Sequence, residues 1–317
     1  MFKYVITLTM VLAMLCSASV VFAHSRGIAN AFFVDNPPDI DGDANDEAWQ
    51  KRWAEFQAGD DGTGPSMHMK PETTPAWFIF DETSPNRISR GNFDSDEDWS
   101  SEFGLLFDEE WLYYAMVVTD DVVFTDLEND PPTVGSNDEM WWMFDFEHNA
   151  PKIPKGNDDR ILAADPDCLF SDGDIYLRYK VFTQKDTTPG CWLSLGTNPD
   201  GGGTFYNEEC SENVVTKVTN DGYVYEGKIT FKEMFKGSKK PNLLPPIDGV
   251  VWGFDSTIDD HDVKGFGREG AISWASSFEN DNMVCGFGDL LFVGTRSVTP
   301  QDKLPTTWGN LKKDATQ

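Results

Sequence analysis

The stretch Glu139-Met140-Trp141-Trp142-Met143-Phe144-Asp145-Phe146-Glu147 decides the fold class. Every second side chain in it is large and apolar, namely Met140, Trp142, Phe144 and Phe146. Successive side chains of a β-strand point to opposite faces of a sheet. The alternation therefore predicts a strand whose even-numbered residues face a hydrophobic core and whose odd-numbered residues face away from it.

Strand patterns of this kind recur along the chain, separated by turn residues such as Asn220-Asp221-Gly222. The expected strands are Phe103–Phe107, Trp111–Val118, Met140–Phe146, Ile175–Phe182, Val214–Val218, Tyr223–Phe231, Val250–Ile258 and Asp289–Val293. Many short strands with turns between them predict an all-β fold, and we expect an antiparallel, jelly-roll-like β-sandwich with long loop insertions. The insertions are residues 57–102 and 149–174, which lack a strand pattern, and long loops are often functional.

The N-terminus has the features of a secretory signal peptide. Lys3 precedes the apolar run Tyr4–Leu15, and Val21-Phe22-Ala23 is a small-x-small cleavage site. The run is shorter than the roughly 20 apolar residues of a membrane span, and no later segment is long and apolar enough to be one. We expect a signal peptide at 1–23, a sandwich domain at 24–297 and a polar tail at 298–317. The protein is expected to be secreted, either periplasmic or extracellular.

The composition is strongly acidic, with 54 Asp and Glu against 25 Lys and Arg, and a formal net charge of −29. Such a charge repels nucleic acid phosphates, so nucleic acid is not an expected partner. It suits neutral ligands or cations. The alternative is that the acidity only keeps a secreted protein in solution.

Four cysteines follow the expected leader: Cys168, Cys191, Cys210 and Cys285. An even number in an oxidising compartment predicts disulfides, and four cysteines leave three pairings open. Three of the four lie within 168–210, which favours a local bridge there.

The odd-numbered side chains of the opening stretch share their expected face with residues from other strands. If these strands share a sheet, its outer face carries aromatic rings among polar groups: Trp141, Asp145, Tyr176, Arg178, Glu226, Asp255 and Thr257. Sugar rings stack their C–H faces on aromatic rings, and sugar hydroxyls pair with charged groups. The face is therefore a candidate saccharide platform. A solvated sheet face is the alternative.

Several motifs, taken in order, resemble the family 9 carbohydrate-binding module. They are Pro38-Asp39-Ile40-Asp41-Gly42 with Asp46-Glu47-Ala48-Trp49, Phe107–Tyr113, Val118-Thr119-Asp120-Asp121, Asp138–Asp145, Gly222-Tyr223-Val224-Tyr225-Glu226, Gly253-Phe254-Asp255 with Asp259-Asp260, and Ile272-Ser273-Trp274 with Phe287-Gly288-Asp289-Leu290. The resemblance implies a sandwich and a non-catalytic module that binds oligo- or polysaccharide, linked to polysaccharide breakdown or capture.

The resemblance is weaker at the ligand site. Family members hold a terminal sugar between two loop tryptophans, and the corresponding stretches here, 135–137 and 278–282, contain none. Arg178 lies close to the family's binding arginine, Trp141 replaces a binding carboxylate, and Trp274 completes the candidate set. Substitutes for the missing clamp are Trp141, Phe278, Trp77 and Trp99.

The family also binds structural calcium. Two acidic groups here suit a hard cation with six to eight oxygen ligands: Asp41, Asp43 and Asp46 around a glycine turn, and Asp120 with Asp121 after a strand. We predict bound Ca2+. The alternative for the first group is that Asp-Gly simply forms a turn.

Other functional classes have less support. The sequence has no HExxH, GxSxG, P-loop or GxGxxG motif, so we do not expect an enzyme. Relatives of this sandwich bind haem b through a methionine and a second side chain. Met140 is expected in the core by alternation, so the candidates are Met116, Met143 and Met283, with ordinary packing as the alternative. An extracellular interaction domain is a third hypothesis.

Overall fold

The computed structural model describes residues 28–50, 77–80, 88–91, 99–124, 138–149, 168, 173–180, 191–195, 204–206, 213–262, 270–274 and 284–294. The strands are β1 (Ile28–Phe33), β2 (Trp77–Phe80), β3 (Ile88–Gly91), β4 (Trp99–Phe107), β5 (Trp111–Asp120), β6 (Glu139–Asp145), β7 (Asp174–Lys180), β8 (Cys191–Leu195), β9 (Thr204–Tyr206), β10 (Val214–Val218), β11 (Gly222–Thr230), β12 (Val251–Asp260), β13 (Gly270–Ser273) and β14 (Gly288–Val293). The helices are α2 (Glu47–Gln50), α6 (Phe231–Gly237) and the 3-10 turn η2 (Val284–Gly286). The predicted all-β class is confirmed.

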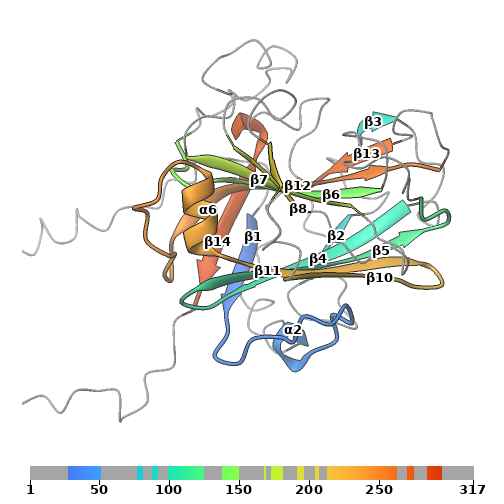
Figure 1. Cartoon of the computed structure of the whole chain (residues 1–317), viewed down its shortest axis with the longest axis horizontal. Coiled ribbons are helices and arrows are strands. Elements are labelled where there is room, and N and C mark those ends of the chain that lie inside the picture. The colour runs from blue at the N-terminus through green and yellow to red at the C-terminus, as the bar shows by residue number, and fades with distance from the viewer. Residues whose placement is uncertain are drawn as a thin grey trace, which may run out of the picture.

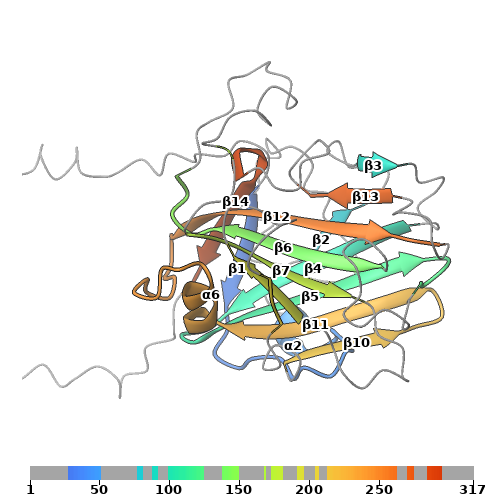
Figure 2. The ribbon, with the colours of Figure 1, turned by 45° about the horizontal axis from the view of Figure 1, so that its top comes forward.

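The strands form one curled sheet that folds into two layers (Figures 1 and 2). Its strand order is β10-β11-β5-β4-β1-β14-β12-β6-β7-β8-β9. The first layer contains β10, β11, β5 and β4, with β2 against β4; the second layer contains β12, β6, β7, β8 and β9, with β13 against β12. β1 and β14 join the two layers, so the core is enclosed by a single hydrogen-bonded sheet.

The joint between the layers departs from the purely antiparallel arrangement that we predicted. β1 runs parallel to both its neighbours, pairing Ile28 with Asp289 of β14 and Ala31 with Leu105 of β4. The other ladders are antiparallel, as in β4 with β5 and β6 with β12. The sheet is therefore mixed at this one strand.

The core lies between the layers and uses the predicted alternation of the opening stretch. Met140, Trp142, Phe144 and Phe146 all belong to the main buried cluster. Trp142 stacks on Phe254 of β12 at 5.8 Å and meets Phe103 of the opposite layer edge-on at 5.4 Å. Aromatic pairs of this kind add about 0.5–1.5 kcal/mol beyond the burial of their area. The stretch therefore connects the two layers directly.

Two predicted elements differ from those in the structure. The strand expected to end at Phe231 ends at Thr230, whose hydroxyl accepts a hydrogen bond from the Glu233 amide and caps helix α6. Thr230-x-x-Glu233 is a capping-box pattern, which indicates a helix start. The stretch 57–102, expected to be a loop, contributes β2 and β3.

Among the helices of the described residues, none has the length and apolar character that crossing a bilayer requires. The expected leader and the tail beyond residue 297 lie outside the described residues.

Candidate functional site

The outer face of the second layer carries the aromatic pair on which the predicted platform depends. Trp141 of β6 and Tyr176 of β7 lie on the side away from the core, and their rings stack with centroids 5.6 Å apart and planes inclined by 17°. In the ladder, Arg178 is opposite Trp141 and Tyr176 is opposite Met143. The stacked rings therefore belong to neighbouring cross-strand pairs and contact each other diagonally. The prediction that these strands place Trp141 and Tyr176 on one sheet face is confirmed.

Polar residues of β12 border the stacked pair. Thr257 pairs directly with Trp141, and its hydroxyl lies 2.7 Å from that of Ser273 on β13. Asp255 pairs with Met143 and accepts a hydrogen bond from the Ser256 amide. The face therefore combines rings, hydroxyls and a carboxylate, which are the groups that sugar recognition uses.

The ladders extend this row to two strands that the sequence analysis missed. Opposite positions in successive ladders run from Thr257 through Trp141 and Arg178 to Trp192 of β8 and Tyr206 of β9. The side chains of the last three positions lie outside the described part of the structure. A signal for β8 was present in the alternation of Trp192 and Ser194 with leucines.

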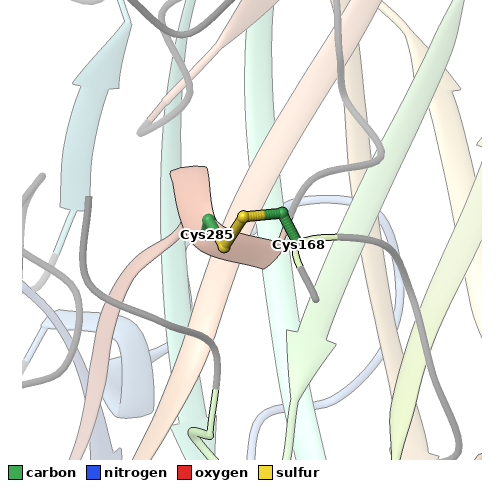
Figure 3. The surroundings of a disulfide bond; sticks show 2 residues. All are labelled: Cys168 and Cys285. Atoms are coloured by element: carbon green, nitrogen blue, oxygen red, sulfur yellow. A yellow bond between two sulfur atoms is a disulfide. The ribbon is translucent and has the colours of Figure 1, made fainter. Parts of the chain in front are cut away.

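The outer face is not the open platform that we predicted. Trp141 is 2% exposed, Tyr176 is 3% exposed, and Asp255 and Thr257 are fully buried. Part of the cover is the disulfide between Cys168 and Cys285, which packs with Tyr176 in one buried cluster (Figure 3). Any ligand of this face must therefore reach a recessed surface.

The same disulfide corrects the predicted local bridge. Cys168 bonds to Cys285, 117 residues away, rather than to a cysteine within 168–210. The remaining pair, Cys191 and Cys210, has no described side chains.

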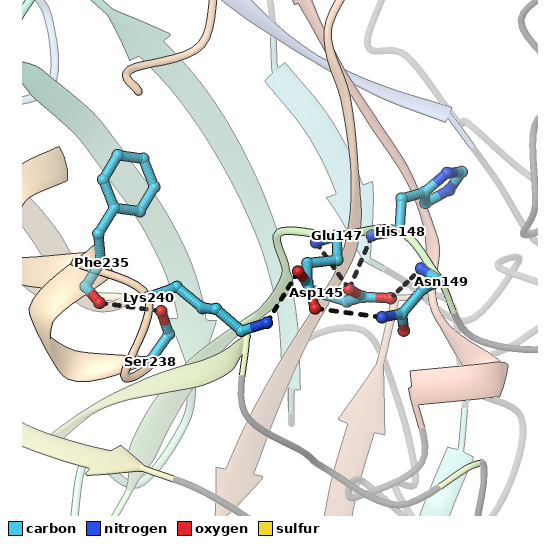
Figure 4. A network of polar contacts seen from close by, with 7 residues as sticks. All are labelled: Asp145, Glu147, His148, Asn149, Phe235, Ser238 and Lys240. Carbon is cyan, nitrogen blue, oxygen red and sulfur yellow. Dashed lines mark hydrogen bonds and ion pairs between the residues drawn. The ribbon is translucent and has the colours of Figure 1, made fainter. Parts of the chain in front are cut away.

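The Asp145 carboxylate is occupied by hydrogen bonds to the turn that follows β6. It is fully buried and accepts hydrogen bonds from the backbone amides of Glu147, His148 and Asn149, at 2.8–3.1 Å (Figure 4). Glu147 in turn pairs with Lys240 beyond α6. Asp145 therefore fixes the turn after β6, and its prediction as a sugar contact is not supported by this geometry.

Glu226 was predicted on the same face as Trp141, but it lies in the other layer. β11 pairs with β5 and β10, and the Glu226 side chain is fully buried on the outer side of the first layer. It accepts hydrogen bonds from the amides of Asp41 and Gly42 and from Trp49 Nε1. The prediction was wrong because residue alternation assigns faces within a strand but not strands to layers.

Trp274 also differs from its predicted position. Its ring lies in the core, 3% exposed, against Phe103 and Phe254. It is a packing residue between the layers rather than part of the outer face.

A second feature of the structure is an acidic centre at one end of the core. Asp120, Asp138 and Asp260 are buried, and each can place a carboxylate oxygen within 4.8 Å of the others. Each lies two positions from a core residue on the same strand face: Val118, Met140 and Ile258. Asp120 comes from the first layer and the other two from the second, so the acidic centre spans the gap between the layers.

Neighbouring carboxylates enlarge this centre. Asp120 also forms a group of the same size with Asp121 and Asp262. Backbone amides donate hydrogen bonds to these carboxylates: Val122 donates to Asp120, while Phe124 and His261 donate to Asp138. Asp138 thus connects the chain that leaves β5, the chain that enters β6 and the chain that leaves β12.

Burial and mutual repulsion both disfavour the ionised forms. Burial raises the pKa of Asp120 to about 6, and the charges of Asp262 and Asp121 add to this shift. Burial and the charge of Asp120 raise the pKa of Asp138 well above its usual range. A bound cation would reverse these shifts, since it favours the ionised carboxylates.

Tyr223 supplies an independent indication of a ligand at the acidic centre. Its side chain is fully buried, and its hydroxyl makes no hydrogen bond within the described part of the chain. Burial raises the pKa of Tyr223, and the charges of Asp138, Asp120 and Asp260 raise it further. A buried hydroxyl without a partner is costly, and here it lies beside a set of oxygen ligands that fits a hard cation such as Ca2+.

The other predicted calcium group is not assembled. Asp41, Asp43 and Asp46 do not come together as a metal-sized group of carboxylates in the described structure. Asp41 accepts a hydrogen bond from the Asp43 amide two residues further on, as in an Asx turn, and Asp46 accepts one from the Asp39 amide seven residues earlier. The turn alternative accounts for this segment.

The methionines considered for haem have packing positions where they are described. Met116 and Met140 belong to the main core cluster, and Met143 packs against the disulfide. Met283 lies outside the described residues. No observation on these side chains favours a haem ligand.

The overall fold is similar to two solved structures of a family 9 carbohydrate-binding module from Caldicellulosiruptor kristjanssonii. In complex with glucose, that module is 17% identical, with a TM-score of 0.48, and the match covers 86% of this chain and 100% of that chain. In complex with cellotriose, it is 16% identical, with a TM-score of 0.45, and the match covers 86% and 98%. No protein-family model and no curated protein matches the sequence.

Proposed function

We propose that the protein is a non-catalytic carbohydrate-binding module, and that its saccharide site is the outer face of β6, β7 and β12. The observation that carries the proposal is the stacked pair Trp141–Tyr176 bordered by Thr257 and Asp255. An ordinary outer sheet face carries solvated charges, whereas this one carries, beneath its cover, rings with hydroxyl and carboxylate groups beside them. The ligand class is oligo- or polysaccharide.

The framework of the molecule supports the same assignment. The first and fifth family-like motifs lie far apart in the sequence, yet Gly42 and Trp49 of one bond to Glu226 of the other. Gly42 has a φ of 80°, a conformation that favours glycine. Its amide reaches the Glu226 carboxylate at 2.8 Å. The shared motif order therefore corresponds to physical contacts.

Because Trp141 and Tyr176 are buried, saccharide binding must change their surroundings. A sugar that stacks on either ring replaces part of its present cover, so binding is coupled to a local rearrangement. Complexes that require such a change associate more slowly than preformed ones. Trp141 emission should then shift on binding.

The proposal includes export and a bound cation. A module with the leader expected at 1–23 would act outside the cytoplasm, in the capture or breakdown of polysaccharide. Calcium would be held by Asp120, Asp138 and Asp260, with Asp121 and Asp262 beside them. Its role would be to neutralise buried charge and to fasten the two layers together.

A glycan array followed by calorimetric titration tests the saccharide site. Glucose and cellotriose are suitable first probes, and Trp141→Ala and Arg178→Ala are the test variants. We expect each variant to weaken binding at least tenfold, since stacking and charged hydrogen bonds contribute about 1–3 kcal/mol each.

A matched control uses a tryptophan on the opposite layer. Trp111 lies on the outer side of the first layer beneath Lys228, and Trp111→Ala should leave saccharide affinity unchanged. Thermal melts of all variants separate loss of binding from loss of folding. Folded Trp141→Ala and Arg178→Ala proteins with wild-type affinity would place the site elsewhere.

A further inference from the structure

The acidic centre and the proposed saccharide face use consecutive residues of the same two strands. Asp138 faces the acidic centre, and its neighbour Glu139 begins β6 on the outer face. At the end of β12, Asp260 faces the acidic centre and Asp259 faces out, directly opposite Glu139 in the ladder. Both outer residues are buried. A displacement at the acidic centre therefore reaches the face through a single peptide unit on each strand.

We propose that a divalent cation at the acidic centre controls the saccharide affinity of the outer face by holding the ends of β6 and β12 in register. The inference rests on the proposed saccharide function. The cation clamps the two layers at one end of the core, with Asp120 on one side and Asp138 and Asp260 on the other.

Hydrogen bonds at Asp138 show which segments a bound cation would hold together. The two oxygens of Asp138 accept the His261 amide, just after β12, and the Phe124 amide, just after β5. Each carboxylate oxygen keeps a second acceptor direction for a cation. Without a cation, repulsion among carboxylates this close opposes the same arrangement, so the strand ends separate more readily.

The path from the acidic centre to the face is short. Trp141 lies three residues after Asp138, and Thr257 lies three residues before Asp260. The two are paired across the ladder, and Ser256 Oγ also donates to the Trp141 carbonyl. Displaced ends of β6 and β12 would move the Trp141 ring relative to Thr257, and a sugar that contacts both groups would then lose one of these contacts.

The Tyr223 hydroxyl, which has no hydrogen-bond partner among the described residues, supports a ligand at the acidic centre independently of the carboxylates. It lies on β11 of the first layer, and its electrostatic neighbours include the three carboxylates of the acidic centre, beside Tyr225. A cation with its coordinated water would give this hydroxyl a hydrogen-bond partner, which buried polar groups nearly always have.

Calorimetric titration of cellotriose, in saturating calcium and in EDTA, tests the linkage on wild-type protein and on Asp260→Asn. Wild type should bind about tenfold more weakly in EDTA, a usual size for coupling between two sites. Asp260→Asn should show the weaker affinity in both conditions. Asp43→Asn, which alters an exposed acid outside the acidic centre, should behave as wild type.

Hydrogen exchange gives a readout that needs no saccharide. Calcium should slow exchange in β6 and at the end of β12 in wild type but not in Asp260→Asn. Helix α6 serves as the internal reference, because it follows Thr230, which pairs with the start of β5 and so lies at the opposite end from Asp120.

The outcomes separate the two proposals. Cellotriose affinity that is equal in calcium and EDTA rejects the linkage and leaves the saccharide function standing. Absence of binding by cellotriose and by every array glycan, with calcium still protecting β6 and β12, rejects the saccharide function and the linkage with it. Unchanged exchange in wild type rejects the cation site itself.

Discussion

The charge on Asp120 should destabilise the protein when no cation is present, and the effect should depend on pH. Burial raises the pKa of Asp120 from 3.8 to about 6. One pKa unit corresponds to about 1.4 kcal/mol, so ionising Asp120 in the folded state costs on the order of 3 kcal/mol. The folded pKa is the higher one. Protonated Asp120 therefore contributes its full stabilisation of the folded state below pH 3.8, and this contribution is lost as pH rises through about 6.

The substitution Asp120→Asn keeps the shape of the side chain and removes its charge. In EDTA we expect wild type to become more stable as pH falls from 7.5 to 5, and the variant to show a smaller pH dependence. At pH 7.5 the variant should be the more stable protein, by up to about 3 kcal/mol. Calcium should reverse this order, because it binds ionised Asp120 and stabilises only the native state.

Urea unfolding at several pH values, in EDTA and in calcium, measures these free energies, and Asp43→Asn serves as the exposed control. Parallel pH profiles for wild type and Asp120→Asn in EDTA would show that the charge of Asp120 does not destabilise the folded protein. So would a variant that is less stable than wild type at pH 7.5 without calcium.

Three further predictions concern the framework. Replacing Cys168 and Cys285 by serine opens a loop closed over 117 residues and should lower the free energy of unfolding by about 2–5 kcal/mol. An unchanged melting temperature under oxidising conditions would contradict the observed bridge. Glu226→Ala removes the acceptor of three hydrogen bonds. It should lower the free energy of unfolding by about 2–4 kcal/mol and leave saccharide affinity intact. A folded variant that loses only binding would return Glu226 to the ligand site. Gly222→Ala places a methyl group 2.1 Å from a β5 carbonyl oxygen, at a residue whose φ is 134°. It should lower the free energy of unfolding, measured in urea, by more than about 2 kcal/mol. A neutral effect would mean that the turn differs from the one described.

Alternation within strands predicted the core of this protein because the rule depends only on neighbouring residues. Met140, Trp142 and Phe144 face inward as expected, and so do Tyr223 and Tyr225 of β11. These positions need no knowledge of which strands pair.

Strand order is a long-range property, and it accounts for the errors at the site. The pattern of β11 gave the correct face for Glu226 but could not show that β11 belongs to the other layer. For the same reason, three of the acidic residues that meet at one end of the core could not be grouped from spacing alone: Asp138, Asp260 and Asp262. Asp120 and Asp121 were predicted together as ligands, since they are adjacent in the sequence.

The burial of the outer face could not be predicted either, because alternation describes only the residues of one strand. Trp141 and Tyr176 were placed on the correct side of the sheet, but the bridge from Cys168 to Cys285 that packs with Tyr176 links residues more than a hundred positions apart. A pattern in β6 carries no information about such a cover.

The most direct test of the saccharide face is the position of the bound sugar. Backbone amide resonances should be followed by NMR while the tightest array glycan is titrated in saturating calcium. Perturbations concentrated at Trp141, Met143, Tyr176 and Thr257 are the predicted result. Perturbations concentrated around Trp49 and Glu226 on the first layer, with those four amides unmoved, would contradict it.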